Sequence, residues 1–314
     1  MNYIIGVDGG GTKTEAVAYS LSDKELGKGH SGFGNLLLDF DQALNNIISA
    51  IKQCKSRINE QDEQRECLCI YLGLAGIETG GYKEKVENLL KKKFNCKVEA
   101  CNDAEIAHAA LLKGKDGIMT ISGTGSISYG LYNGKRDRTG GWGHILGDEG
   151  SGYFIALEAF KRMTLEEDLG WVKSKLTQTI MNKLNLNEVN DIKEFVYKSS
   201  KGDIAAYAPL VVELAKGSEV NSVNILKNAG KELAIMTERL YKKLGINESI
   251  NIGVKGSILT KVNIVMEEFK NYLQINLVGV TIIVDDVSPT KGACYLHKML
   301  YDNHTNNNII PKYR

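Results

Sequence analysis

Two glycine-rich turns, at corresponding places in the two halves of the chain, constrain its fold most. The apolar segment 3–7 runs into Asp8-Gly9-Gly10-Gly11-Thr12-Lys13-Thr14 and then into a second apolar segment, 15–19. Residues 117–121 begin the pattern again, followed by Ser122-Gly123-Thr124-Gly125-Ser126 and the segment 127–131. Short apolar segments bounded by turn residues are typical of buried strands. This weak internal repeat predicts two related α/β domains that face each other across a cleft.

The spacing of apolar residues predicts the other elements. In the first half, helical spacing at 39–58, 82–94 and 103–112 alternates with further apolar strands. We therefore expect an N-terminal domain at 1–113 and a C-terminal domain at 114–288. A C-terminal helix at about 289–314 is expected to pack back onto the first domain. The remaining predicted strands are 27–32, 67–73, 97–101, 136–139, 250–254 and 280–284.

Charge and composition exclude several classes of partner. The net charge of +1, from 39 basic and 38 acidic residues, provides no electrostatic footprint for nucleic acid or an anionic membrane surface. The N-terminus lacks a basic leader with a cleavage site, and no run of 18 apolar residues suggests a membrane span. We expect a cytoplasmic protein. Its six cysteines are expected to be free thiols, with Cys67 and Cys69 on one face of a strand.

The first glycine turn has the composition of a phosphate-binding loop. Glycines let the backbone approach a ligand closely, and successive backbone N–H groups can surround phosphate oxygens. Thr12 adds a hydroxyl and Lys13 a positive charge, while Asp8 could hold Mg²⁺ through water. The alternative is an ordinary β-hairpin turn. The second turn, with Thr124, has the same chemistry, and the pair could hold a triphosphate from two sides.

Asp103 is the candidate general base. It follows the predicted strand 97–101, and ligands of α/β sheets bind at the carboxyl ends of strands. A kinase needs a carboxylate to accept the proton of the attacking hydroxyl. The alternative is a helix N-cap, and Asp103 could fill both roles. We expect its pKa to be that of an ordinary aspartate, about 3.9.

A third glycine-rich segment, 140–152, contains Trp142, His144 and Asp148. Its glycines favour close approach to a ligand, and Asp148 could accept hydrogen bonds from sugar hydroxyls. The alternative is a loop that ends with Asp148 as a helix N-cap. His144 is interpreted as structural. Two shorter turns, around Asn35 and around Gly256, could contact a hydroxyl or a nucleoside, or be ordinary turns.

Together these motifs resemble the N-acetylglucosamine kinase family, within the larger BadF/BadG-type group of actin-like ATPases. The run Gly141-Trp142-Gly143-His144, continued through Gly147-Asp148-Glu149-Gly150-Ser151, is its most specific part. The resemblance implies a duplicated ribonuclease H-like fold of the actin and hexokinase type. By resemblance, ATP contacts fall on Gly10, Gly11, Thr12, Lys13, Thr124, Ala205 and Gly256. Sugar contacts fall on Asn35, Asp103, Ser126, Ile127, Gly141, Trp142, Gly143 and Asp148, with Asp103 as the base.

The resemblance also implies ATP and Mg²⁺, transfer to the 6-hydroxyl of an amino sugar, and a homodimer. N-acetylglucosamine, glucosamine and N-acetylmuramic acid remain alternative substrates. One rival function is the ATPase that activates 2-hydroxyacyl-CoA dehydratases, which would need cluster-binding cysteines in the second domain. Residues 102–293 contain no cysteine, which argues against it. A second rival is a non-enzymatic sugar sensor, for which no helix-turn-helix precedes the first strand.

Overall fold

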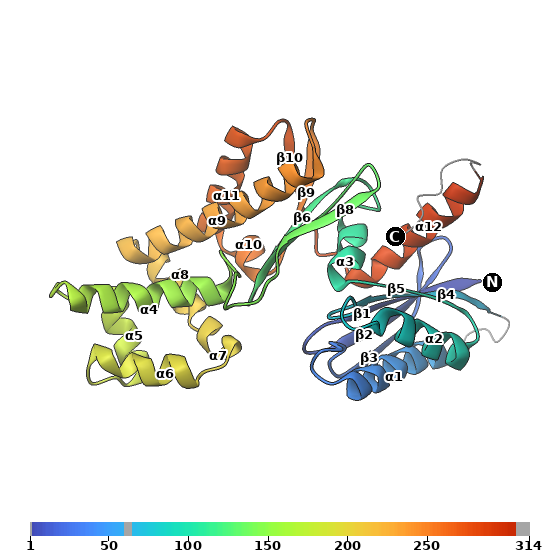
Figure 1. Ribbon diagram of the computed structural model, residues 1–314, viewed down its shortest axis with the longest axis horizontal. Helices are drawn as coiled ribbons and strands as arrows, with labels where there is room; N and C mark the ends of the chain where they lie inside the picture. Colours follow the sequence, from blue (N-terminus) through green and yellow to red (C-terminus); the bar gives the residue numbers. More distant parts are fainter. Residues whose placement is uncertain (1, 60–64, 306–314) are drawn as a thin grey trace. The chain divides into compact units, whose positions relative to one another are not determined.

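The computed structural model describes residues 2–59 and 65–305, and the chain forms two compact units (Figure 1). Unit 1 comprises Met1–Lys115 and Asp286–Arg314, and unit 2 comprises Asp116–Asp285. The last nine residues of the C-terminal helix predicted at 289–314 lie outside the described residues. No helix in the described ranges is both long and apolar enough to span a membrane.

Unit 1 is a five-stranded mixed sheet with helices on both faces. Its strand order is β3-β2-β1-β4-β5, in which β1 pairs antiparallel with β2 and parallel with β4. The strands are β1 Tyr3–Gly9, β2 Thr14–Ser20, β3 Glu25–Ser31, β4 Cys67–Leu74 and β5 Lys97–Cys101. The helices are α1 Phe40–Asn59, α2 Tyr82–Phe94, α3 Asp103–Leu111 and α12 Gly292–Thr305, the last preceded by a 3₁₀ turn, Pro289–Lys291.

The alternation of apolar residues along the strands divides the core of unit 1 between the two faces of the sheet. Tyr3, Ile5 and Val7 of β1 pack in one cluster with buried residues of α1 and α2. Ile4 packs in the other cluster with residues of α3 and α12. Figure 1 shows α1 and α2 together on one side of this sheet.

The two thiols of β4 face opposite sides of the sheet, so the prediction that they share a face is wrong. The pairing of β1 with β4 shifts register between Tyr3, which pairs with Cys67, and Ile4, which pairs with Cys69. A β-bulge of this kind adds one residue to a strand and interrupts the alternation of side chains. Cys67 therefore lies in the α1/α2 cluster and Cys69 in the α3/α12 cluster. All six cysteines are free.

Unit 2 has a second five-stranded sheet, in the order β10-β9-β6-β7-β8. Its strands are β6 Gly117–Ser122, β7 Ser126–Tyr132, β8 Lys135–Gly140, β9 Ile250–Lys255 and β10 Val280–Val284. The helices are α4 Gly152–Asp168, α5 Lys175–Leu184, α6 Ile192–Lys198, α7 Lys201–Ala205, α8 Ala208–Lys216, α9 Val220–Leu244, α10 Ser257–Lys261 and α11 Asn263–Asn276, with a 3₁₀ turn at Val189–Asp191.

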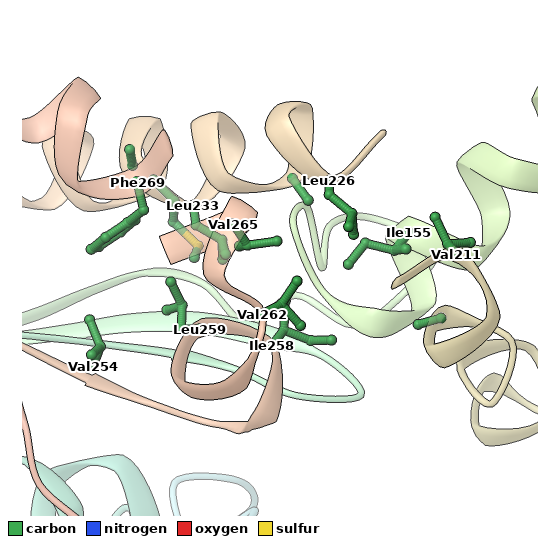
Figure 2. Packing of buried hydrophobic residues seen from close by; sticks show 14 of the residues in the cluster. Ile155, Val211, Leu226, Leu233, Val254, Ile258, Leu259, Val262, Val265 and Phe269 are labelled. Carbon is green, nitrogen blue, oxygen red and sulfur yellow. The ribbon is translucent and has the colours of Figure 1, made fainter. Parts of the chain in front are cut away.

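The long helix α9 organises the core of unit 2. Leu226 and Leu233 of α9 are fully buried, and Leu233 lies near Val265 and Phe269 of α11 (Figure 2). Ile155 of α4 belongs to the same cluster. Burial of each such side chain contributes roughly 1.5–3 kcal/mol. This packing fixes the helical layer that supports the loops of unit 2.

The two sheets have the same topology. In each, the first strand pairs antiparallel with the second and parallel with the fourth, while the third pairs with the second and the fifth with the fourth. The internal repeat predicted from the two glycine turns is therefore real. Each turn joins the first two strands of its own sheet: residues 10–13 join β1 to β2, and residues 123–125 join β6 to β7.

Candidate active site

The carboxyl edge of the unit 1 sheet brings two of the predicted site segments together beside the end of β4. The O atom of Gly10 accepts hydrogen bonds from the N–H groups of Gly34 and Asn35, at 2.8 and 3.1 Å. Ala75, just past β4, donates to the O of Gly9 at 3.0 Å. The first glycine loop, the Asn35 turn and the end of β4 are thus joined by backbone hydrogen bonds.

The tip of the first glycine loop is exposed to solvent. Gly11, Thr12 and Lys13 are exposed, and the N–H of Gly10 donates to the O of Lys13 at 3.1 Å. Asp8 is half-buried next to the end of β1. Asn35 Oδ1 accepts from the N–H of Leu37 at 2.9 Å, so a ligand would find the amide NH₂ as a donor.

Asp103 lies on the same edge of the sheet, at the start of α3. Gly73 of β4 makes room for this helix, since a Cβ on Gly73 would lie 2.0 Å from Ile106 and 3.5 Å from the Cα of Asp103. The N-cap is Asn102, whose side chain accepts from the N–H of Ala104 at 2.9 Å. Asp103 is the first helical residue, and its Oδ1 shares that N–H at 3.0 Å. The N-cap role considered for Asp103 therefore belongs to its neighbour.

Burial raises the pKa of the Asp103 carboxyl above its ordinary value, and the nearby Glu78 adds to the effect. Hydrogen bonds from the N–H groups of Ala104 and of Asp103 itself act in the opposite direction. The expectation of an ordinary pKa is therefore wrong. A carboxylate with a raised pKa is a stronger proton acceptor, as a general base requires.

In unit 2, the second glycine loop is held by backbone contacts from two directions. The O of Gly123 accepts from the N–H of Gly152 at 2.7 Å, and the O of Thr124 from Tyr153 at 3.4 Å. A Cβ on Gly256 would lie 2.2 Å from the O of Ser122, and the φ of Gly256 is +87°, so only glycine fits there. The O of Ala205 is 3.8 Å from a Cβ placed on Gly152. Thr124, Ala205 and Gly256 therefore all lie around this loop.

The segment after β8 is held against the same loop. Gly141 donates its N–H to the O of Ser126 at 3.1 Å and packs on Ile127. The hydroxyl of Ser126 donates to the O of Glu149 at 2.7 Å. These contacts bring the predicted sugar-contacting residues of unit 2 into one region, with Gly143 at a φ of +84°.

Trp142 is an exposed aromatic residue of this segment. Its side chain is 64% exposed, and the Arg138 guanidinium lies 4.7 Å from the ring centre. A hollow of about 290 Å³ opens beside it, lined by Arg138, Trp142, Glu149, Glu232, Met236 and Arg239 among others. His144 packs edge-on against Tyr153, with ring centres 5.0 Å apart.

Asp148 is not a helix N-cap, because α4 begins at Gly152 and is capped by Ser151. Asp148 is buried and adopts a left-handed backbone, with a φ of +67°. Its Oδ1 accepts from the N–H of Ser126 at 3.0 Å, and its Oδ2 lies 2.5 Å from Lys201 Nζ. Sequence reasoning missed Lys201, since no pattern links two side chains that meet only through the fold of the helical layer.

Comparison with known proteins decides the family. The family model described as "BadF/BadG/BcrA/BcrD ATPase family" matches residues 5–294. The chain belongs to the BadF/BadG/BcrA/BcrD ATPase family. An N-acetylmuramic acid/N-acetylglucosamine kinase of Clostridium acetobutylicum is 32% identical over 289 residues, which cover 90% of this chain and 94% of the relative. An N-acetyl-D-glucosamine kinase of Dictyostelium discoideum is 31% identical over 310 residues, covering 93% and 96%.

Solved structures confirm the fold of this BadF/BadG-type protein. A crystal structure of a Chromobacterium violaceum protein superposes with a TM-score of 0.74 at 20% identity, over 94% of this chain and 98% of the other. A ROK family glucokinase from Streptomyces griseus, in complex with glucose and AMPPNP, gives a TM-score of 0.56 at 14% identity, over 95% and 98%. The predicted duplicated fold of the actin and hexokinase type is confirmed.

Proposed function

We propose that this BadF/BadG-type protein is a kinase that transfers the γ-phosphoryl group of ATP to the 6-hydroxyl of an amino sugar. N-acetylglucosamine is the first candidate substrate, because it is named for both relatives that are more than 30% identical. N-acetylmuramic acid, named for the first, and glucosamine, named for a Vibrio cholerae relative that is 25% identical, come next.

One observation carries the phosphate-binding part of the proposal. Gly10, Gly11 and Gly123 have no positive φ, and a Cβ on any of them would meet no other residue within 4 Å. Neither the backbone conformation nor the packing of the protein calls for glycine at these positions. A ligand that lies against the backbone would require glycine at these positions, and the backbone N–H groups of such loops can bind phosphate oxygens. These glycines lie in both loops of the duplicated fold.

The chemistry follows from what each group offers. Asp103 accepts the proton of the sugar hydroxyl, the hydroxyl oxygen bonds to the γ-phosphorus, and the bond from that phosphorus to the bridging oxygen of ADP breaks. Backbone N–H groups of the two loops, with the hydroxyls of Thr12 and Thr124, stabilise the phosphate charge. Asp148 and the backbone of residues 141–143 orient the sugar.

Mg²⁺ fits this site as part of the nucleotide complex. No three acidic, histidine or cysteine side chains in the described ranges gather into a metal site. Mg²⁺ commonly relies on one or two carboxylates together with substrate phosphates. Asp8, next to the first loop, would hold it through water, and the ion would neutralise charge on the phosphates.

The test is an activity assay with purified protein, Mg·ATP and a panel of amino sugars, read by ADP release and by the mass of the product. We expect a gain of one phosphoryl group on N-acetylglucosamine or one of the two other candidates. ADP release without any phosphorylated sugar would contradict the kinase assignment and favour an ATPase.

A further inference from the structure

The ion pair between Asp148 and Lys201 lies directly against the second glycine loop. A Cβ placed on Gly125 would be 2.6 Å from Lys201 Nζ and 2.7 Å from Asp148 Oδ1. This pair leaves no room for a side chain at Gly125. At Gly123, two residues earlier, an added Cβ would have no neighbour within 4 Å. The loop and the ammonium group are immediate neighbours.

The two members of the pair differ in exposure. The Asp148 side chain is 4% exposed, whereas that of Lys201 is 31% exposed. Asp148 is anchored through its Oδ1 by the N–H of Ser126, which leaves its Oδ2 for the ammonium. An ammonium group has three donors, and Asp148 is the single ion-pair partner that Lys201 has within the described ranges. One ion pair therefore holds the Lys201 side chain in place, and part of this side chain is exposed to solvent beside the loop.

A buried carboxylate under an anion-binding loop needs a counter-charge. Without one, Asp148 would repel phosphates placed on residues 123–125, since unit charges a few Å apart interact by several kcal/mol near a protein surface. Lys201 neutralises that carboxylate and adds donors of its own. Ammonium groups bind phosphate oxygens through strong, charge-assisted hydrogen bonds.

We propose that Lys201 is a phosphate-binding residue of the nucleotide site, held in place by Asp148. The inference rests on the proposed function, because it assumes that the second loop receives the nucleotide phosphates. It gives Asp148 a second task besides sugar binding, that of orienting the ammonium group. It also joins the sugar-contacting segment to the phosphate loop through one pair of side chains.

The experiment compares two ligands on the full chain by isothermal titration calorimetry, with Mg·AMPPNP as the phosphate-bearing probe and adenosine as the probe without phosphates. For Lys201→Met we expect Mg·AMPPNP to bind about 10- to 100-fold more weakly, the range for loss of a hydrogen bond to a charged group. Adenosine affinity should stay within about twofold. Lys201→Arg, which keeps the charge, should recover most of the loss.

Lys198→Met is the matched control. Lys198 precedes α7, pairs with Glu194 at 2.7 Å and is 75% exposed, so its loss should change neither affinity. Circular dichroism and the melting temperature of each variant establish that it is folded. If Lys201→Met does not fold, Lys201→Arg and Lys201→Gln provide the same comparison of the two ligands.

Two results would overturn the inference. Equal losses of AMPPNP and adenosine affinity would make Lys201 a purely structural residue, and unchanged affinities would remove it from the site. Failure of the proposed function looks different, because the wild-type protein would then bind no nucleotide or phosphorylate no amino sugar. A wild-type kinase whose Lys201→Met variant keeps its AMPPNP affinity would refute the role of Lys201 alone.

Discussion

The two glycine loops join equivalent strands of two sheets with the same topology, yet their surroundings differ. The first loop is tied to the Asn35 turn through the O of Gly10, and its own Lys13 is exposed. The second loop is backed by the first turn of α4 and by the pair formed by Asp148 and Lys201. The sheet and the loop backbone are therefore repeated in the two units, while the charged groups around the two loops differ.

The difference arises from what connects the third and fourth strands. In unit 1 the described residues of that connection include one helix, α1. In unit 2 it contains the Trp142 segment and the helices from α4 to α9, including the helix that begins with Lys201. The candidate base, Asp103, lies in unit 1, and the segment proposed to select the sugar lies largely in unit 2. Four predictions test this division, in order of decreasing effect.

The largest effect should come from the carboxylate of unit 1. We predict that Asp103→Asn lowers kcat by at least about 100-fold, the lower end of the range for a general base, with little change in sugar affinity. Steady-state kinetics at saturating ATP measure both. Asp41→Asn, on the exposed first turn of α1, is the control. Turnover at the wild-type rate would remove Asp103 from the chemistry.

The next effect distinguishes glycines that serve a ligand from those that serve the fold. Gly11→Ala and Gly123→Ala add a Cβ to open positions, so the free energy of unfolding should change by no more than about 0.5 kcal/mol. The KM for ATP should rise about tenfold, because the new methyl group lies where the phosphates bind. Urea unfolding and initial rates measure the two quantities. An unchanged KM in both variants would contradict the phosphate-binding role of the loops.

Gly125→Ala should behave in the opposite way. Its Cβ would overlap the pair of Asp148 and Lys201, so we expect destabilisation of about 1–3 kcal/mol, as for other overpacked positions. Urea unfolding of Gly125→Ala beside Gly123→Ala provides the measurement. Equal stabilities would show that the pair of Asp148 and Lys201 does not restrict the residue at position 125.

The smallest effect concerns pH and stability. Because folding raises the pKa of Asp103, its protonation favours the folded state. That contribution is fully present below the pKa of the unfolded carboxyl and is lost as pH rises through the raised pKa. The asparagine in Asp103→Asn does not titrate, so the variant does not lose this stability as the pH rises. The melting temperature of the variant relative to that of the wild type should therefore rise from acid to neutral pH. A difference that stays constant with pH would contradict the shift.

The sequence predicted the scaffold well, because strands and helices follow local patterns of apolar residues. The glycine turn between the first two strands, the strand 97–101 and the helix that begins at Asp103 were all located correctly. Three features escaped prediction because they depend on the folded chain. The bulge at Cys67 depends on the register with β1, the raised pKa of Asp103 depends on burial, and the partner of Asp148 is supplied by a helix of the inserted layer.

The central claim is that both loops serve one transfer of a phosphoryl group to the 6-hydroxyl of an amino sugar. The most direct test is NMR of the product formed from Mg·ATP and N-acetylglucosamine, since coupling between phosphorus and the protons on C6 identifies the esterified oxygen. The account predicts a phosphomonoester on O6. Inorganic phosphate as the sole phosphorus-containing product besides ADP, or a phosphate on another oxygen, would contradict it.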